Sequence, residues 1–228
     1  EVKDLVIPSG VTAINSYAFY DYDALTSITL PEGMTLIGES AFYYCNNLWI
    51  VINKSDLTIT AGSKDNGYVA YYAAIVTDSE SKIKTVGDYI FCADGDTVVL
   101  IAYTGSETSI TLPSDYEGKN YNIGDYAFVD CYSLTSITLP KGLTSIGYSA
   151  FYNCFRLASV TLGKAISSID SYAFYGCSSL TNVTIPDSVK TINNHAFFYC
   201  DLLKKVVLGN GLITIGASAF ESCTSLES

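Results

Sequence analysis

A seven-residue segment recurs along this chain at a constant interval. Residues 134–140 read LTSITLP, and close copies begin at Leu25, Leu157, Leu180 and Leu203. The starts 134, 157, 180 and 203 differ by 23 each time, and so do the starts 2, 25 and 48. A unit of this length cannot bury its own apolar side, whereas stacked units share a continuous core. The spacing therefore predicts a solenoid.

Each repeat contains two kinds of apolar pattern. Leu134, Ile137 and Leu139 give a short strand with one buried side. The following Pro ends the strand, since proline cannot extend the hydrogen-bond ladder. An Ile and an Ala-Phe pair come next, and most repeats close on a Cys three residues after the Phe, a spacing that suits one or two turns of helix. We therefore expect an α/β fold: a right-handed leucine-rich-repeat solenoid with a short strand plus a short helix per turn.

The register breaks between Asn53 and about Glu107, so residues 54–107 are expected to form an irregular, β-rich insertion. The segment GYVAYYAA (67–74) is a candidate substitute for the helix of the third repeat. Residues 89–103 indicate a β-hairpin with Asp94-Gly95 as its turn. The echo of the repeat in VGDYIF (86–91) leaves a degenerate repeat as the alternative. After the array resumes, residues 117–120 are expected to bulge.

Composition limits the classes of partner. The chain has 228 residues, of which 49% are apolar and only 15% charged, with a formal net charge of −11. That apolar content supports one domain, a single solenoid over 1–228, and we expect it to be part of a longer protein. An acidic chain repels phosphate backbones, so we expect no nucleic-acid partner. No apolar run is long enough for direct membrane insertion.

The repeat resembles the BspA-like leucine-rich repeat family, whose pattern is LTxIxLPxxLxxIGxxAFxxCxx. The likeness covers roughly residues 2–52 and 108–228. It implies a secreted or cell-surface bacterial protein, and for some members adhesion to host proteins or cells. The family brings no catalytic residues to this chain, and fold analogy alone does not identify a ligand.

No residue pattern indicates catalysis, a metal or a cofactor. The cysteines at 45, 131, 154, 177, 200 and 223 share one repeat position, so we interpret them as small buried thiols, with disulfides between neighbouring turns as the alternative. There is no Cys-x-x-Cys, and the single histidine, His195, stands at a variable position. We expect a protein that is not an enzyme.

Two surfaces are candidates for ligand binding. The strand positions expected to face outward are mostly Thr, but Trp49, Ile50 and Ile52 interrupt that pattern beside the insertion. Either the insertion covers this patch, or the patch is an open site together with Tyr89 and Tyr103 of the hairpin.

The second surface is a tyrosine column that follows the Ala-Phe pairs and includes Tyr43, Tyr152 and Tyr175. Tyrosine offers a large contact area with a polar tip, which suits recognition. The alternative is that these rings only pack between turns. The sequence thus favours a non-catalytic module that binds a protein or glycan ligand, host-derived ligands included, with a rigid spacer for another domain as the second hypothesis.

Overall fold

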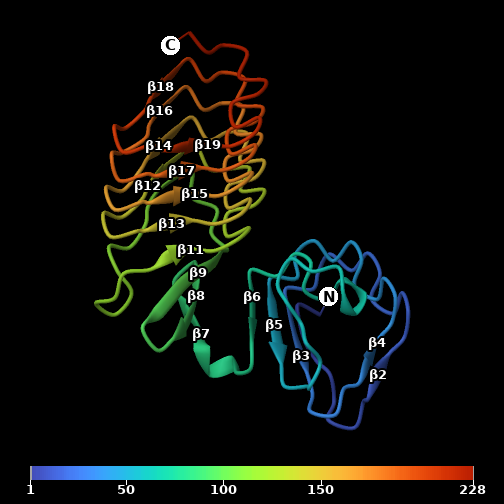
Figure 1. Ribbon diagram of the computed structural model, residues 1–228. Coiled ribbons are helices and arrows are strands. Elements are labelled where there is room, and N and C mark those ends of the chain that lie inside the picture. The colour runs from blue at the N-terminus through green and yellow to red at the C-terminus, as the bar shows by residue number, and fades with distance from the viewer. Residues whose placement is uncertain (1, 228) are drawn as a thin grey trace. The chain divides into compact units, whose positions relative to one another are not determined.

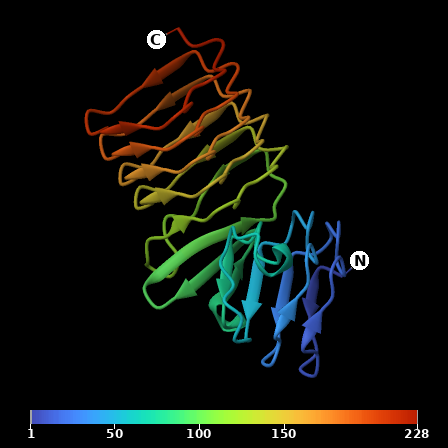
Figure 2. The ribbon, with the colours of Figure 1, turned by 45° about the vertical axis from the view of Figure 1, so that its right-hand side comes forward.

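The computed structural model describes residues 2–227 and divides into two compact units, Glu1–Lys84 (unit 1) and Thr85–Ser228 (unit 2). Each unit is a stack of coils whose strands run parallel from one coil to the next, as Figures 1 and 2 show. The boundary between the units falls inside the inserted segment, within strand β7 (Ile83–Val86).

Every regular coil contributes one strand of three or four residues to one sheet, which we call the long-strand sheet. It contributes one strand of two residues to a second sheet, which we call the short-strand sheet. In unit 1 the long-strand sheet has the order β1 (Asp4–Val6), β3 (Ser27–Leu30), β5 (Ile50–Asn53) and β6 (Ile75–Thr77). The short-strand sheet pairs β2 (Ala13–Ile14) with β4 (Leu36–Ile37). The register is that of the repeat, since Ile28 pairs with Leu5, 23 residues earlier.

Unit 2 repeats this arrangement over more coils. Its long-strand sheet has the order β10 (Ser109–Thr111), β12 (Ser136–Thr138), β14 (Ser159–Thr161), β16 (Asn182–Thr184) and β18 (Lys205–Val207). Its short-strand sheet has the order β19 (Thr214–Ile215), β17 (Thr191–Ile192), β15 (Ser168–Ile169), β13 (Ser145–Ile146), β11 (Asn122–Ile123), β9 (Thr97–Tyr103), β8 (Tyr89–Asp94) and β7.

The expectation of an α/β fold with one helix per turn is wrong. The described residues form a β-solenoid without any α-helix, and the helical pieces that they contain are two single 3-10 turns, η1 (Asn66–Tyr68) and η2 (Glu80–Lys82). We call the third side of the coil, which carries the Ala-Phe pairs, the Ala-Phe edge. It consists of consecutive turns.

Hydrogen bonding explains why the Ala-Phe edge is not helical. An α-helix needs each N–H to bond a carbonyl four residues earlier in the same segment. Here alternate N–H groups donate to the next coil instead, as from Phe151 to the carbonyl of Ala173 at 2.7 Å. The N–H groups between them close tight turns, as from Tyr152 to the carbonyl of Ser149 at 3.1 Å. The edge is therefore a third ladder between coils.

Two left-handed residues per coil turn the backbone in this way. Ser149 and Asn153, four residues apart, have φ values of 51° and 58°. A left-handed residue within the segment breaks the continuous right-handed backbone that a helix needs. Other coils place equivalent residues at the same two positions: Tyr17 with Asp21, Ser40 with Tyr44, Tyr126 with Asp130, Tyr172 with Gly176, His195 with Tyr199, and Ser218 with Ser222.

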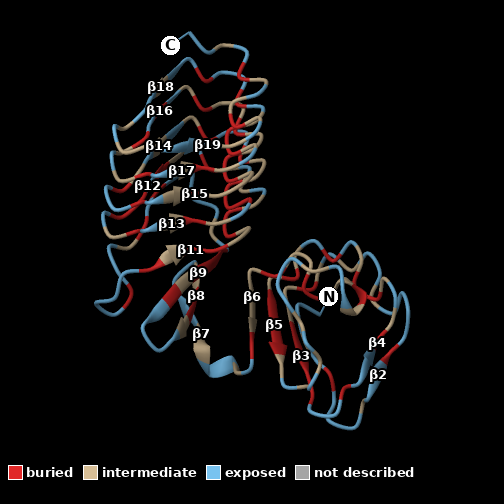
Figure 3. Ribbon diagram, viewed as in Figure 1, coloured by how far each residue is buried: buried red, intermediate tan, exposed pale blue. Residues whose placement is uncertain are grey.

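The core lies inside the coils. Leu134, Ile137 and Leu139 keep at most 3% of their surface, as the alternating strand pattern predicts. The Ala-Phe phenylalanines of unit 2 stack in a buried column, with neighbouring centroids such as Phe151 and Phe174 5.0 Å apart. Figure 3 shows the buried residues concentrated along the inner side of this edge.

The inserted segment contains both structures that the sequence left open. Strands β8 and β9 form an antiparallel hairpin, and β9 also pairs parallel with β11, so it occupies a repeat position as well. Asp94 pairs with Thr97, which places the turn at Gly95-Asp96, one residue later than expected. Gly95 has a φ of 60° at the first central position, as a type II′ turn requires.

Candidate functional site: aromatic rings along the Ala-Phe edge

The Ala-Phe edge carries aromatic rings on its outer side as well as in the core. In unit 2 the outer column contains Tyr152, Tyr175 and Phe198. Their centroids are 4.7 and 5.4 Å apart and each pair of planes differs by only 6°. The sides of these rings that face one another are therefore covered, and all three residues are half-buried.

Unit 1 arranges its outer rings differently. Here the rings of neighbouring coils meet at steep angles, 47° between Tyr20 and Tyr43 and 65° between Tyr43 and Tyr68. Tyr20 and Tyr44 meet almost at a right angle, 87°, as the equivalent Tyr175 and Tyr199 of unit 2 also do at 85°, so the difference between the units lies in the column that directly follows the Ala-Phe pairs. Steep angles leave ring faces partly uncovered. We call this group the tyrosine cluster: Tyr17, Tyr20, Tyr43, Tyr44, Tyr68, Tyr71 and Tyr72.

Three rings of the tyrosine cluster are exposed, whereas the three rings of the outer column of unit 2 are half-buried. Tyr17 keeps 57% of its surface, and Tyr20 and Tyr44 each keep 43%. The hydroxyl of Tyr44 is hydrogen-bonded to Tyr43, and this bond is the largest cause of its raised pKa. Burial raises the pKa of Tyr72, with smaller contributions from neighbouring tyrosines and Asp23. These two phenols therefore stay neutral at physiological pH and keep their hydroxyl protons for hydrogen bonding.

The sequence pointed to this surface only through Tyr43 and the column that contains it. Tyr68, Tyr71 and Tyr72 lie in the irregular segment, where no repeat position could be assigned to them. The tyrosine doublets 43–44 and 71–72 were the available signal, because their second members have no counterpart in most repeats.

The Trp49 patch is largely covered. Ile50 and Ile52 keep 7% and 5% of their surface, although both stand at outward strand positions. Glu80 of η2 reaches this side of the sheet, where the Thr29 hydroxyl donates to its carboxylate at 3.3 Å. Trp49 is half-buried, and its indole Nε1 is buried without a hydrogen-bond partner.

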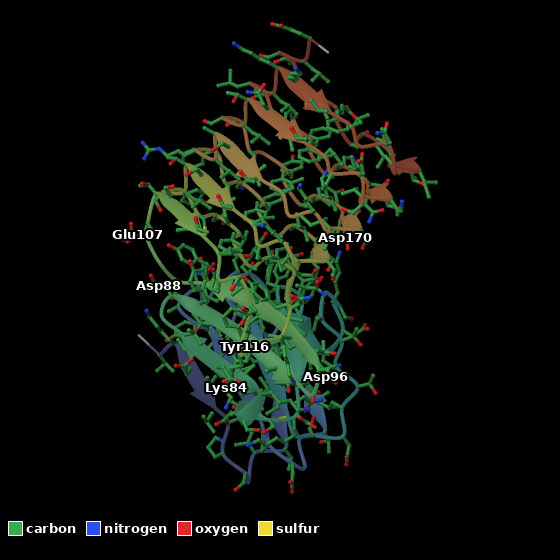
Figure 4. All side chains as sticks on the ribbon, turned by 90° about the vertical axis from the view of Figure 1, so that its left-hand side faces the viewer. Lys84, Asp88, Asp96, Glu107, Tyr116 and Asp170 are labelled. Atoms are coloured by element: carbon green, nitrogen blue, oxygen red, sulfur yellow. The ribbon has the colours of Figure 1, made fainter. Side chains whose placement is uncertain are left out.

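The two hairpin tyrosines lie together but offer little surface. Tyr103 keeps 7% of its surface and stacks on Phe128 at 5.4 Å, so it takes the phenylalanine position of its coil. Tyr89 is half-buried beside it, with ring centroids 5.4 Å apart. The N–H of Glu107 donates to the Tyr103 hydroxyl. Figure 4 labels Asp88 and Glu107 in this part of unit 2.

A groove that the sequence did not indicate lies on the long-strand side of unit 2. It has a volume of about 820 Å³ and spans the ends of β14, β16 and β18. Thr161, Thr184 and Asn210 contribute polar groups to its lining, with Leu162 and Ile185 among its apolar residues. The groove is open to solvent, and neighbouring coils line it with residues from the same repeat positions, such as Leu162, Ile185 and Leu208.

The remaining polar candidates hold coils together. The Asp125 carboxylate accepts the Tyr148 N–H at 2.8 Å, and burial, followed by the charge of Asp170, raises the pKa of Asp125. Asp170, labelled in Figure 4, accepts a hydrogen bond from the Asn193 amide at 3.1 Å. These carboxylates connect neighbouring coils, which accounts for their position without a chemical role.

Histidine and cysteine also have packing roles. His195 stacks on Tyr172 with centroids 4.8 Å apart and planes 3° apart. None of the seven cysteines, all of which lie in the described residues, forms a disulfide, and the Cys154 Sγ donates to the Phe128 carbonyl of an earlier coil at 3.0 Å. The described residues contain no group of three or more His, Cys, Asp or Glu side chains placed to hold a metal ion. They also contain no helix of the length and apolarity that a membrane span requires.

Comparison with known proteins identifies the repeat. Residues 1–94 and 101–227 match the model of the BspA type leucine rich repeat region, in six copies. A leucine rich cell surface protein from Faecalibacterium prausnitzii is 25% identical, with a TM-score of 0.64 over 95% of this chain. The chain spans 62% of the length of that protein.

Two further crystal structures share the fold. A leucine-rich repeat protein from Bacteroides capillosus is 30% identical over 56% of this chain and 98% of its own length, with a TM-score of 0.50. The pneumococcal vaccine antigen PcpA is 21% identical over 99% of this chain and 67% of its own length, with a TM-score of 0.62. No curated protein sequence matches significantly. Because the family model matches nearly the whole length, this chain belongs to the BspA type leucine rich repeat family.

Proposed function

We propose that this chain is a non-catalytic interaction module, displayed on a bacterial surface or secreted, that binds a protein or glycan ligand through the tyrosine cluster of unit 1. The family and the Faecalibacterium relative, which is described as a cell surface protein, support the location. The acidic charge of the chain argues against nucleic acid as the ligand.

The exposed, steeply inclined rings of the tyrosine cluster are the observation that carries this proposal. Tyr17, Tyr20 and Tyr44 keep 43–57% of their surface on a rigid edge of the solenoid. Tyrosine and tryptophan dominate binding energy when a partner buries them, and a tyrosine loses little conformational entropy in doing so. Rings held by neighbouring coils are already positioned before the partner arrives.

A binding screen with matched variants tests the proposal. The purified chain is applied to arrays of extracellular host proteins and of glycans, beside Tyr20→Leu and Tyr175→Leu. Both tyrosines directly follow an Ala-Phe pair, but only Tyr20 belongs to the tyrosine cluster. We expect Tyr20→Leu to weaken array binding and Tyr175→Leu to preserve it. Equal binding by all three proteins would refute the tyrosine cluster as the site.

A spacer is the second candidate function, and the uniformity of unit 2 favours it. The phenylalanines of its core column stack almost parallel, as for Phe151 and Phe174, whose planes differ by 4°. If this array only holds the binding surface at a distance, a variant without residues 157–179, one repeat, keeps ligand affinity and cooperative unfolding. Loss of affinity in such a folded variant would contradict the spacer role.

A further inference from the structure

The exposed rings of the tyrosine cluster, Tyr17, Tyr20 and Tyr44, lie in a stretch of sequence without basic residues. Between Lys3 and Lys54 there is no lysine or arginine. The same stretch contains five acidic residues: Asp4, Asp21, Asp23, Glu32 and Glu39. Two of these, Asp21 and Asp23, come directly after Tyr20 and Tyr22, so their charge is close to the exposed rings.

The local contacts place this charge among the tyrosines. The N–H of Asp21 donates to the carbonyl of Tyr43 at 2.8 Å, which fixes the residue against the next coil. The negative charge of Asp21 contributes, after the hydrogen bond to Tyr43, to the raised pKa of Tyr44. Asp23 Oδ1 accepts the backbone N–H of Asn46 at 3.2 Å and its side-chain amide at 3.1 Å, and both of these donors are uncharged.

One ring of the tyrosine cluster already has a cation of the chain over its face. The Lys64 ammonium lies over the ring of Tyr71, 5.8 Å from its centroid. A cation at this distance from an aromatic face is attracted by the negative potential of the ring. Tyr17, Tyr20 and Tyr44 have no such partner in the described structure, and their exposure leaves them accessible to a cation from another molecule.

We propose that the tyrosine cluster, with Asp21 and Asp23, binds a lysine- or arginine-rich segment of a partner protein. This inference rests on the proposed function and specifies the chemistry of the ligand. Aliphatic stems of such side chains pack on ring faces while their charged ends meet the carboxylates. A neutral glycan would leave the carboxylates unused, and an anionic surface would be repelled by them.

A lysine-rich peptide provides a direct test. Its fluorescein-labelled form is titrated with the full chain while anisotropy is measured, and the same peptide with every lysine acetylated serves as the uncharged control. Asp21→Asn removes charge at a left-handed position that asparagine tolerates. Asp130→Asn is its match in unit 2, because Asp130 has the same conformation and donates its N–H to Tyr152 in the same way.

We expect the acetylated peptide to bind at least about tenfold more weakly than the lysine-rich peptide. Tyr20→Leu and Asp21→Asn should each weaken binding of the lysine-rich peptide about fivefold, because a change of that size matches the free energy of one cation–π contact or one close charge pair. Tyr175→Leu and Asp130→Asn should bind as the unmodified chain does. Thermal unfolding of each variant establishes that it is folded.

Equal weakening by Asp21→Asn and Asp130→Asn would mean that the peptide follows net charge alone, and would overturn the inference. Binding of the acetylated peptide with unchanged affinity would do so too. If the array screen finds a glycan or acidic protein that depends on Tyr20 while the peptide does not bind, the proposed function stands and this inference fails. If neither probe depends on Tyr20, both fail.

Discussion

Truncation of Phe174 should destabilise unit 2 far more than truncation of Tyr175, its neighbour in sequence. Phe174 is fully buried and stacks on Phe151 and Phe197, with centroids 5.0 and 5.1 Å away. Removal of a buried phenylalanine costs roughly 3–5 kcal/mol, and the position in a close-packed stack between coils places the change at the upper end. Tyr175 is half-buried and makes two outer stacking contacts, each worth about 0.5–1.5 kcal/mol.

The assay is equilibrium denaturation with urea, followed by circular dichroism, for the unmodified chain, Phe174→Ala and Tyr175→Ala. We expect Phe174→Ala to lose at least about 2 kcal/mol more unfolding free energy than Tyr175→Ala. In a solenoid, one weakened coil also uncouples its neighbours, so the Phe174 variant should unfold in a broader transition. Equal losses would refute the division of this edge into a core column and an outer column.

Three further outcomes are expected. The single tryptophan, half-buried at Trp49, should show blue-shifted emission and weak acrylamide quenching, and red-shifted, readily quenched emission would contradict its covered position. Thiol reagents should reach Cys177 only after denaturation, since the thiol is buried and burial raises its pKa. All seven cysteines should react once the chain is denatured, and three disulfides per chain would refute the interpretation of the cysteines as thiols. Gly67→Ala should cost about 2 kcal/mol or more, because Gly67 has a φ of 61° and the added Cβ would run into the Gly38 carbonyl oxygen. Gly62→Ala, with a φ of 77° and open space around it, is the control and should cost less in the same urea assay.

The core and the strand register could be predicted because they depend on repeated residue types. Apolar residues at alternate positions, such as Leu134, Ile137 and Leu139, must share one side of a strand. The 23-residue period then fixes which residue of the next coil lies beside each one, as Ile137 beside Val160.

The conformation of the Ala-Phe edge could not be predicted in the same way. Apolar residues three or four positions apart suit a helix, yet a series of turns buries Ala150, Phe151 and Cys154 equally well. Only the hydrogen bonds between coils decide between a helix and a series of turns, and the sequence of a single repeat does not predict these bonds. The asparagine at 153 and the glycine at 176, both common in left-handed conformation, were the available sign.

The candidate site was predicted in part for a similar reason. Tyr43, Tyr152 and Tyr175 were expected in one column, but their accessible surface depends on ring tilt, which the neighbouring coil determines. In the column that directly follows the Ala-Phe pairs, neighbouring rings stack parallel in unit 2, whereas they meet at steep angles in unit 1. Tyr103 was expected on the surface of the hairpin. It stacks instead on Phe128 of the core column, because its strand β9 pairs with β11, and the sequence did not assign β9 to a regular repeat.

Hydroxyl-radical footprinting of the chain with and without a bound ligand tests the central claim most directly, because it reports the exposure of individual tyrosines. The ligand is the strongest binder from the arrays or, failing that, the lysine-rich peptide. We predict that the ligand protects Tyr17, Tyr20 and Tyr44 from oxidation and leaves Tyr132 and Tyr199, exposed tyrosines of unit 2, unchanged. Protection confined to unit 2, or none at the three unit 1 tyrosines at saturating ligand, would contradict the claim that the tyrosine cluster is the binding surface.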